Sequence, residues 1–110
     1  MTKVNVSGYN ERLYLEVCGH SVPEGGGESA DSKIVCAAVS ILLLSAAQRL
    51  CEMESMGDFN FASISVESGY ALFDLEPRDD SRERTEEIIE MLLSGFSLLE
   101  EHYPELIAVK

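Results

Sequence analysis

The feature that most constrains this chain is an apolar run in its first half. From Ile34 to Ala47, only Ser40 and Ser45 interrupt the series of apolar side chains. The run is shorter than the ~20 residues that a membrane span needs, so it predicts a buried helix in a globular domain. Because this helix would be apolar nearly all round, we expect a sheet to cover one side and a second helix or a second subunit to cover another.

Two β-hairpins are predicted on either side of this helix, within residues 4–17 and 62–75. In each, apolar side chains alternate with polar ones along two arms, which is the pattern of half-buried strands. Residues 7–10 and the pair Ser68-Gly69 have the character of turns between those arms.

The central helix is predicted to start at an N-cap, either Asp31 or Ser32, and to end before Gly57. A second, amphipathic helix is predicted to follow the second hairpin, where Asp80 and Glu83 have the spacing of a capping box. The glutamates of this helix lie off its apolar face, so they are expected to form a solvated surface.

The order of elements predicts the fold class. Leu106 to Val109 is apolar enough for a short final edge strand, which gives the order ββαββα with an optional terminal strand. This order fits an α+β fold, a two-layer sandwich in which two helices cover one face of an antiparallel or mixed sheet. With 110 residues the chain suits one hydrophobic core, so residues 1–110 are expected to form a single domain.

The charge balance restricts the possible partners. The chain has 8 Lys and Arg residues and 20 Asp and Glu residues, which gives a net charge of -12. Such a surface repels phosphates and anionic lipid head groups, so we expect no nucleic-acid partner and no membrane partner. A basic polypeptide is the partner that this charge favours.

The cysteines predict a reducing compartment. There are 3 of them, an odd number, in a chain without a secretory signal, which argues for free thiols and a cytoplasmic location. Cys36 and Cys51 also lie on the same predicted helix, several turns apart and too far from each other to form a disulfide.

A nucleophile and a base converge around the start of the central helix. Cys36 is predicted in the first turn, where the positive end of the helix favours a thiolate, and Lys33 adds a cation three positions earlier. His20, at the end of the preceding strand, can take the thiol proton and later return it to a leaving amine. The unpaired N–H groups of the first turn could hold an oxyanion. Residues 21–32 contain Pro23 and a glycine triplet, which predicts a mobile loop that could act as a lid.

Neither residue is distinctive by itself. A free cysteine is more often a small buried hydrophobe than a nucleophile, and His20 could be an incidental polar residue before a loop. Cys18 and His20 share one face of a strand, but zinc needs more ligands than this pair provides, so no metal site is predicted. The glycine triplet lacks the Gly-Lys-Ser/Thr of a phosphate loop, and no cofactor is predicted.

The block from Ile34 to Ser40, preceded by Gly19-His20 and a glycine-containing loop, changes this balance. It resembles the ribosomal-processing cysteine protease family, called Prp, whose members show a Gly-His, a short loop and an Asp-Ile-Val-Cys-Ala-x-x-Ser block. The resemblance implies an α+β homodimer that uses a Cys/His pair to remove the N-terminal extension of a large-subunit ribosomal protein. By the same resemblance, Cys36 would be the nucleophile, His20 the general base and Ser40 the family serine one helical turn later.

Two departures accompany this likeness. Lys33 stands where the family has an acidic residue, and the loop between His20 and Cys36 is longer than usual. Asp31 could supply the missing carboxylate beside His20. Ser40 has a second interpretation as a helix serine bonded to a carbonyl one turn back. Besides a cysteine endopeptidase, the chain could be an inactive relative that binds basic peptides as a dimeric adaptor, or a purely structural small dimer.

Overall fold

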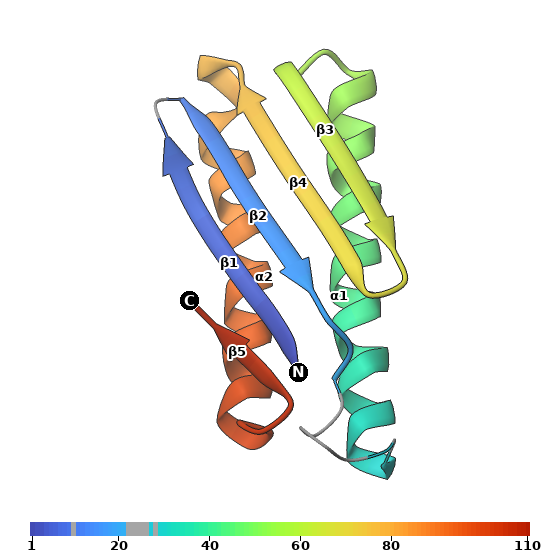
Figure 1. Cartoon of the computed structure of the whole chain (residues 1–110). Helices are drawn as coiled ribbons and strands as arrows, with labels where there is room; N and C mark the ends of the chain where they lie inside the picture. The colour runs from blue at the N-terminus through green and yellow to red at the C-terminus, as the bar shows by residue number, and fades with distance from the viewer. Residues whose placement is uncertain (10, 22–26, 28) are drawn as a thin grey trace.

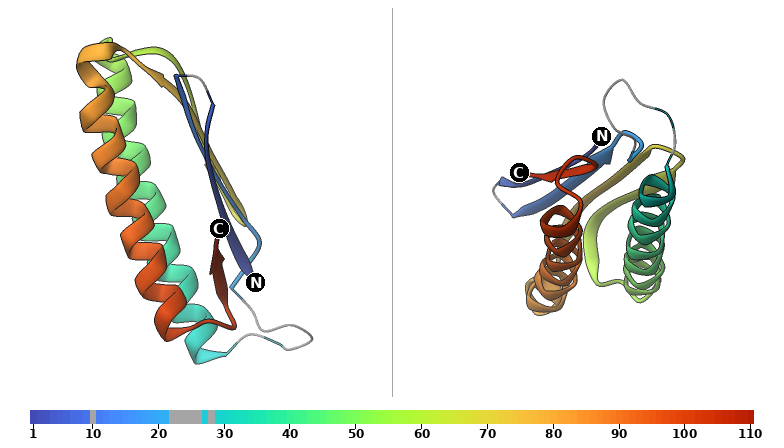
Figure 2. Two further views of the ribbon diagram at one scale, coloured as in Figure 1. Left: turned by 90° about the vertical axis from the view of Figure 1, so that its left-hand side faces the viewer. Right: turned by 90° about the horizontal axis from the view of Figure 1, so that it is seen from below.

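The computed structural model describes residues 1–9, 11–21, 27 and 29–110, and the chain is folded into two layers (Figure 1). Five strands form one sheet, and two long helices lie side by side on one of its faces (Figure 2). In chain order the elements are β1 (Thr2–Tyr9), β2 (Arg12–Cys18), α1 (Ala30–Ser55), β3 (Phe59–Glu67), β4 (Tyr70–Pro77), the 3-10 turn η1 (Asp79–Ser81), α2 (Arg82–His102) and β5 (Ile107–Val109). The predicted α+β sandwich and its order of elements are confirmed.

The sheet is mixed. Its strand order is β3-β4-β2-β1-β5, and all neighbours are antiparallel except β1 and β5, which are parallel. The sequence left antiparallel and mixed sheets as alternatives, because no local pattern fixes the direction in which a last strand is added. Strand β5 forms one edge, as predicted for the end of the chain, and β3 forms the other.

The first hairpin is longer than predicted. Strand pairing continues to Tyr9, which lies opposite Arg12, so Ser7 and Gly8 belong to β1. The predicted turn over these residues is wrong, and its last residue, Asn10, lies outside the described residues. Each added pair contributes backbone hydrogen bonds and cross-strand contacts, which outweigh the turn preference of a serine and a glycine.

The second hairpin has the predicted two-residue turn. Strand β3 ends at Glu67 and β4 starts at Tyr70, so Ser68-Gly69 connects them. Gly69 has a φ of 77°, a left-handed conformation that glycine adopts without steric cost. Because Tyr70 pairs with Cys18, the turn lies beside the residues that follow β2.

Helix α1 starts earlier than predicted. Its N-cap is Ser29, not Asp31 or Ser32. Ser29 Oγ accepts a hydrogen bond from the Ser32 N–H at 3.1 Å, and Ser32 Oγ accepts one from the Ser29 N–H at 2.7 Å. This reciprocal pair satisfies two backbone donors, which explains why the earlier serine wins over Asp31. After Met56 the helix gives way to Gly57, with a φ of 81°, as the sequence predicted.

Helix α2 also starts differently from the prediction. Its N-cap is Ser81, whose side chain makes no capping hydrogen bond, and the predicted capping box of Asp80 and Glu83 is absent from these described residues. The turn η1 precedes the helix, and its Ser81 N–H already donates to the Arg78 carbonyl at 2.9 Å. Asp80 instead points to Arg78, 4.0 Å away. A backbone turn has therefore replaced the side-chain cap.

The core lies between the sheet and the facing sides of both helices. Phe73 of β4 and Phe96 of α2 are its largest fully buried side chains. Gly95 allows α2 to approach α1, since a Cβ there would lie 2.9 Å from Leu42 Cδ1. The buried apolar residues of α1 are Val35, Val39, Leu43, Ala46, Leu50 and Met53.

One side of α1 remains uncovered. Ile34, Ile41 and Leu44 are 53%, 63% and 53% exposed, and their spacing places them along one side of the helix. By length and composition alone α1 could cross a membrane, with a mean hydropathy of 2.0. Core helices of globular proteins share this property, and α1 packs its opposite side into the core.

Candidate active site

A cleft of about 490 Å³ lies where the end of β2, the start of β1, the β3–β4 turn and α1 meet. Both His20 and Cys36 line it, so the structure brings the predicted base and the predicted nucleophile to one hollow. Its lining residues are Thr2, Val17, Gly19, His20, Ser21, Cys36, Val39, Ser40, Leu43, Leu44, Val66, Glu67, Ser68, Gly69 and Tyr70.

His20 follows β2 within a segment held by its neighbours on both sides. The Gly19 N–H donates to the Gly69 carbonyl at 2.9 Å, and the Gly19 carbonyl accepts from Thr2 Oγ1 at 3.2 Å. On the other side, Ser21 Oγ lies 2.5 Å from Thr2 Oγ1. The His20 side chain itself is exposed. The main chain at Gly19 and the side chain of Ser21 are thus held by hydrogen bonds, while the imidazole between them is exposed.

Cys36 is half-buried on α1, but not in the first turn as predicted. Because the helix begins at Ala30, Cys36 is its seventh residue and ends the second turn. The positive end of a helix acts mainly within the first turn, so it cannot be the main source of a Cys36 thiolate. The first-turn N–H groups of Ser32 and Lys33 donate to Ser29, so the predicted oxyanion site at these groups is wrong. The cause is the early N-cap, which adds a turn before the cysteine.

Of the three other predicted site residues, one lines the cleft and two do not. Ser40 is exposed and lines the cleft one turn after Cys36. Asp31 and Lys33 are exposed near the start of α1 and do not appear among the described residues that line the cleft. The predicted lid falls largely on residues 22–26 and 28, which lie outside the described residues.

Several residues of the cleft were not singled out from the sequence. Thr2 and Ser21 are almost fully buried, and Gly69 faces the His20 ring. Tyr70 donates its hydroxyl proton to Glu16 at 2.9 Å, and this hydrogen bond is the main cause that raises the pKa of Tyr70 above its ordinary value. The turn at Gly69 was predicted, but its contact with His20 joins distant parts of the chain and has no local signal.

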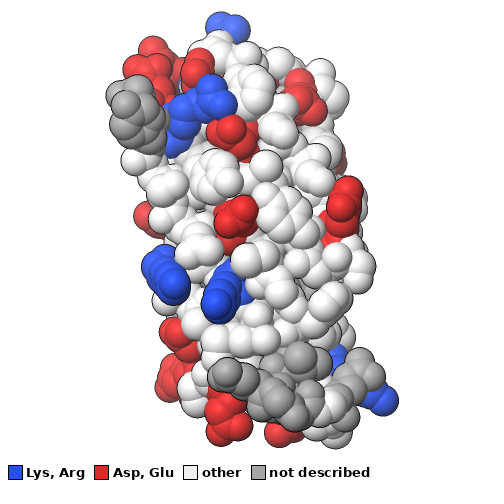
Figure 3. All heavy atoms as spheres, viewed as in Figure 1, with Lys and Arg blue, Asp and Glu red and all other residues white. Residues whose placement is uncertain are grey.

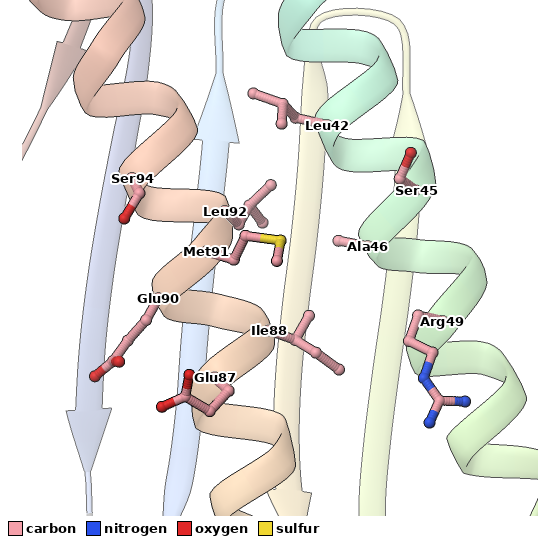
Figure 4. A pocket seen from close by; sticks show the side chains of 10 residues that line it. All are labelled: Leu42, Ser45, Ala46, Arg49, Glu87, Ile88, Glu90, Met91, Leu92 and Ser94. Carbon is pink, nitrogen blue, oxygen red and sulfur yellow. The ribbon is translucent and has the colours of Figure 1, made fainter.

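A second hollow, a groove of about 550 Å³, lies between α1 and α2 (Figure 4). Met91 of α2 points toward α1 at the level of Ala46, and Ile88 points toward it at the level of Arg49 (Figure 4). Among the described residues that line this groove there is no cysteine and no histidine. It therefore lacks the groups for nucleophilic or acid–base chemistry by a thiol and an imidazole.

The open face of the sheet also lacks a concentrated charge. Figure 3 shows it largely uncharged, with acidic and basic side chains scattered over it. One of its ion pairs joins Arg12 and Asp74 at 2.9 Å, and the Arg12 guanidinium lies 4.3 Å from the centre of the Phe61 ring. In the described part of the chain, no group of three or more His, Cys, Asp or Glu residues could hold a metal ion.

Comparison with known proteins identifies the family. Residues 1–108 match the family described as cysteine protease Prp. A structure of the essential ribosomal processing protease Prp from S. aureus with a substrate peptide is 20% identical, with a TM-score of 0.69, covering 100% of this chain and 98% of that one. The same protease with a covalently linked product peptide is 19% identical, with a TM-score of 0.66 and the same coverage of both chains.

SMU.848 from Streptococcus mutans is 24% identical, with a TM-score of 0.67, covering 100% of this chain and 92% of that one. At these identities the solved structures show a common fold. The comparison with curated protein sequences finds no match. Because the family match spans nearly the whole chain, this protein belongs to the Prp family of cysteine proteases.

Proposed function

We propose that this protein is a cysteine endopeptidase in which Cys36 is the nucleophile and His20 the general base. The observation that carries the proposal is that both residues line one cleft, although they come from different elements. Family membership supports the reaction class. Ser40 lines the same cleft and is proposed as a supporting residue.

The reaction needs only these two side chains and water. His20 takes the proton of the Cys36 thiol, and the thiolate attacks the carbonyl carbon of a peptide bond. The C–N bond then breaks as the imidazolium gives its proton to the leaving amine, which leaves a thioester on Cys36. Water, deprotonated by His20, hydrolyses the thioester and restores the thiol.

The proposed substrate is a basic polypeptide, namely the N-terminal extension of a ribosomal protein. The net charge of -12 favours a cationic partner, and the acidic residue Glu67 is among those that line the cleft. The related S. aureus structures are described as a ribosomal processing protease with a substrate or product peptide, which supports a peptide in this cleft. We further propose that the enzyme acts in the cytoplasm, without binding nucleic acid or membranes.

A homodimer is also proposed, because an apolar stripe on α1 needs a cover. The stripe consists of Ile34, Ile41 and Leu44, each more than half exposed. Leu44 also lines the cleft, so a partner seated on the stripe would lie beside the proposed active site.

Incubation with the ribosomal proteins of the same cell, followed by intact-mass measurement, tests the function. We expect one protein to lose an N-terminal segment, and we expect Cys36→Ala to abolish the trimming. Cys51→Ala is the matched control, since Cys51 is an exposed cysteine on the same helix, more than four turns away. Trimming that persists in Cys36→Ala, or that never occurs with the wild-type protein, would contradict the proposal.

A dimeric peptide-binding adaptor is the second candidate. Its support is that, within the described part of the chain, no carboxylate is hydrogen-bonded to His20 and neither Asp31 nor Lys33 lines the cleft. Alkylation by iodoacetamide near neutral pH separates the two functions. Cys51 is exposed and Cys36 only half so, so exposure alone would make Cys51 react faster. Faster labelling of Cys36 favours the peptidase, and slower labelling favours the adaptor.

A further inference from the structure

We propose that Gly69 is a positioning residue for His20 and that the buried hydroxyls of Thr2 and Ser21 complete the same support. The inference rests on the proposed role of His20 as the base. An exposed imidazole on a segment beyond the end of a strand would sample several rotamers unless a neighbour held it. Three contacts around His20 restrict both its main chain and its ring.

The first contact is between the imidazole and the bare Cα of Gly69. A Cβ on Gly69 would lie 2.8 Å from His20 Nε2, 3.2 Å from Cε1 and 3.4 Å from Cδ2. An atom in line with the Nε2 lone pair would lie much farther from the two carbons than from the nitrogen. These similar distances instead place the Cβ over the face of the ring near Nε2. The ring therefore rests flat on the turn, and the contact leaves the in-plane direction of Nε2 open for proton exchange.

The second contact ties the main chain before His20 to the same turn. The Gly19 N–H donates to the Gly69 carbonyl at 2.9 Å. Gly19 has a φ of 92°, and a Cβ there would collide with the Met1 carbonyl oxygen. Gly19 therefore lets the chain pass the Met1 backbone, and Gly69 lets the His20 ring lie on the turn.

The third contact is made by Thr2 of β1, which is hydrogen-bonded to the residues on both sides of His20. Thr2 Oγ1 donates to the Gly19 carbonyl and lies 2.5 Å from Ser21 Oγ. Thr2 and Ser21 are 2% and 0% exposed, so water does not compete for these hydroxyls. The Thr2 N–H in turn donates to the Leu106 carbonyl at 2.9 Å, which fixes Thr2 to the segment before β5.

A base must lie within hydrogen-bond reach of the proton that it takes, and a misplacement of about 1 Å can cost about 100-fold in rate. Gly69→Ala puts a methyl where the His20 ring lies, so the ring must move. Gly57→Ala is the matched control, because Gly57 has nearly the same φ, 81° against 77°, and a Cβ there meets nothing within 4 Å. Both variants put a side chain at a positive φ, and only in Gly69→Ala would the new Cβ meet His20.

The test has two readouts. In the first, the ring carbon and nitrogen shifts of His20 are followed by NMR through a pH titration, with His102 as an internal reference in the same spectra. In the second, kcat and KM are measured with the ribosomal protein that the enzyme trims as the substrate. We expect Gly69→Ala to shift the His20 signals and to lower kcat by about 10- to 100-fold with KM nearly unchanged. Gly57→Ala should leave the His20 signals in place and change kcat by less than about 2-fold.

Unchanged His20 signals in Gly69→Ala would overturn the inference, whatever happens to turnover. Shifted His20 signals in a protein that trims nothing would support the positioning role while contradicting the proposed peptidase. If Gly69→Ala does not fold, the double variant Thr2→Val, Ser21→Ala takes its place, since it removes both hydroxyls and keeps the packing. This double variant should also shift the His20 signals and leave those of His102 unchanged. His20 signals like those of the wild type would refute the proposal that the two hydroxyls help to position His20.

Discussion

Removing the hydroxyl of Thr2 should destabilise the fold more than removing that of Ser21. Their Oγ atoms are 2.5 Å apart, and both residues are buried. Thr2 Oγ1 also donates to the Gly19 carbonyl, and a hydroxyl has one hydrogen. Ser21 must therefore be the donor in the pair and Thr2 the acceptor. The hydrogen bonds run in one direction, from Ser21 through Thr2 to Gly19, which makes the two deletions unequal.

The magnitudes follow from what each deletion leaves behind. Thr2→Val leaves the buried Ser21 hydroxyl without its acceptor and removes the donor to the Gly19 carbonyl. We therefore expect a loss of about 2–3 kcal/mol in the free energy of unfolding. Ser21→Ala removes one hydrogen bond and leaves Thr2 still donating, so we expect a loss of about 1 kcal/mol. The double variant leaves no hydroxyl without a partner. Its loss of stability should therefore be about 1 kcal/mol smaller than the sum of the losses of the two single variants.

Urea unfolding followed by circular dichroism measures all three differences, provided that the slope with urea is the same for the variants. Additivity within about 0.5 kcal/mol would show that the two hydroxyls do not interact. A larger loss from Ser21→Ala than from Thr2→Val would show that the assigned direction of the hydrogen bonds is wrong.

Three further predictions concern single side chains. Because the Glu16 carboxylate accepts from Tyr70 and raises its pKa, the contribution of this hydrogen bond to stability is full below the ordinary value of 10.0 and is lost as pH rises through the raised value. When the pH is raised from neutral to strongly alkaline, the free energy of unfolding of Tyr70→Phe should therefore fall less than that of the wild type, as urea unfolding at each pH would measure. Lys33→Asp should slow alkylation of Cys36, since it replaces an exposed cation three positions before the thiol with a carboxylate, which repels an attacking thiolate; an unchanged rate would show that Lys33 does not act on the thiol. Ile41→Glu should convert the proposed dimer to a monomer in light scattering at micromolar concentration, because it places a charge in the middle of the exposed stripe of α1, and a wild-type protein that is already monomeric would contradict the dimer.

The sequence predicted the architecture well because the governing signals are local and periodic. The alternation of apolar residues in both hairpins, the all-round apolar helix and the Ser68-Gly69 turn each need only a few neighbouring residues. The helix starts were predicted less well. Ser29 caps α1 through a reciprocal pair with Ser32, and a serine in the third helical position is a weaker sequence signal than Asp31 as a cap.

The sequence predicted which two residues would share the candidate site, but not the contacts around them. His20 and Cys36 were proposed as base and nucleophile from the sequence, and the structure places both at one cleft. The contacts that hold His20 could not be predicted, because Thr2 and Gly69 reach it only through the pairing of β1 with β2 and of β2 with β4. A glycine in a turn and a threonine near a terminus carry no sign of a role at a site formed by other segments.

The early start of α1 changes how the thiol of Cys36 can be activated. With Cys36 in the first turn, both the positive end of the helix and His20 would have favoured formation of the thiolate. In the structure Cys36 ends the second turn, so most of that contribution is lost, and in the proposed mechanism His20 is left as the group that takes the proton. A pair that relies on its base is sensitive to where the base lies, since proton transfer falls off outside hydrogen-bond reach. The contacts of Thr2, Ser21 and Gly69 around an otherwise exposed imidazole are therefore expected to matter more for turnover here than they would beside a thiol at a helix start.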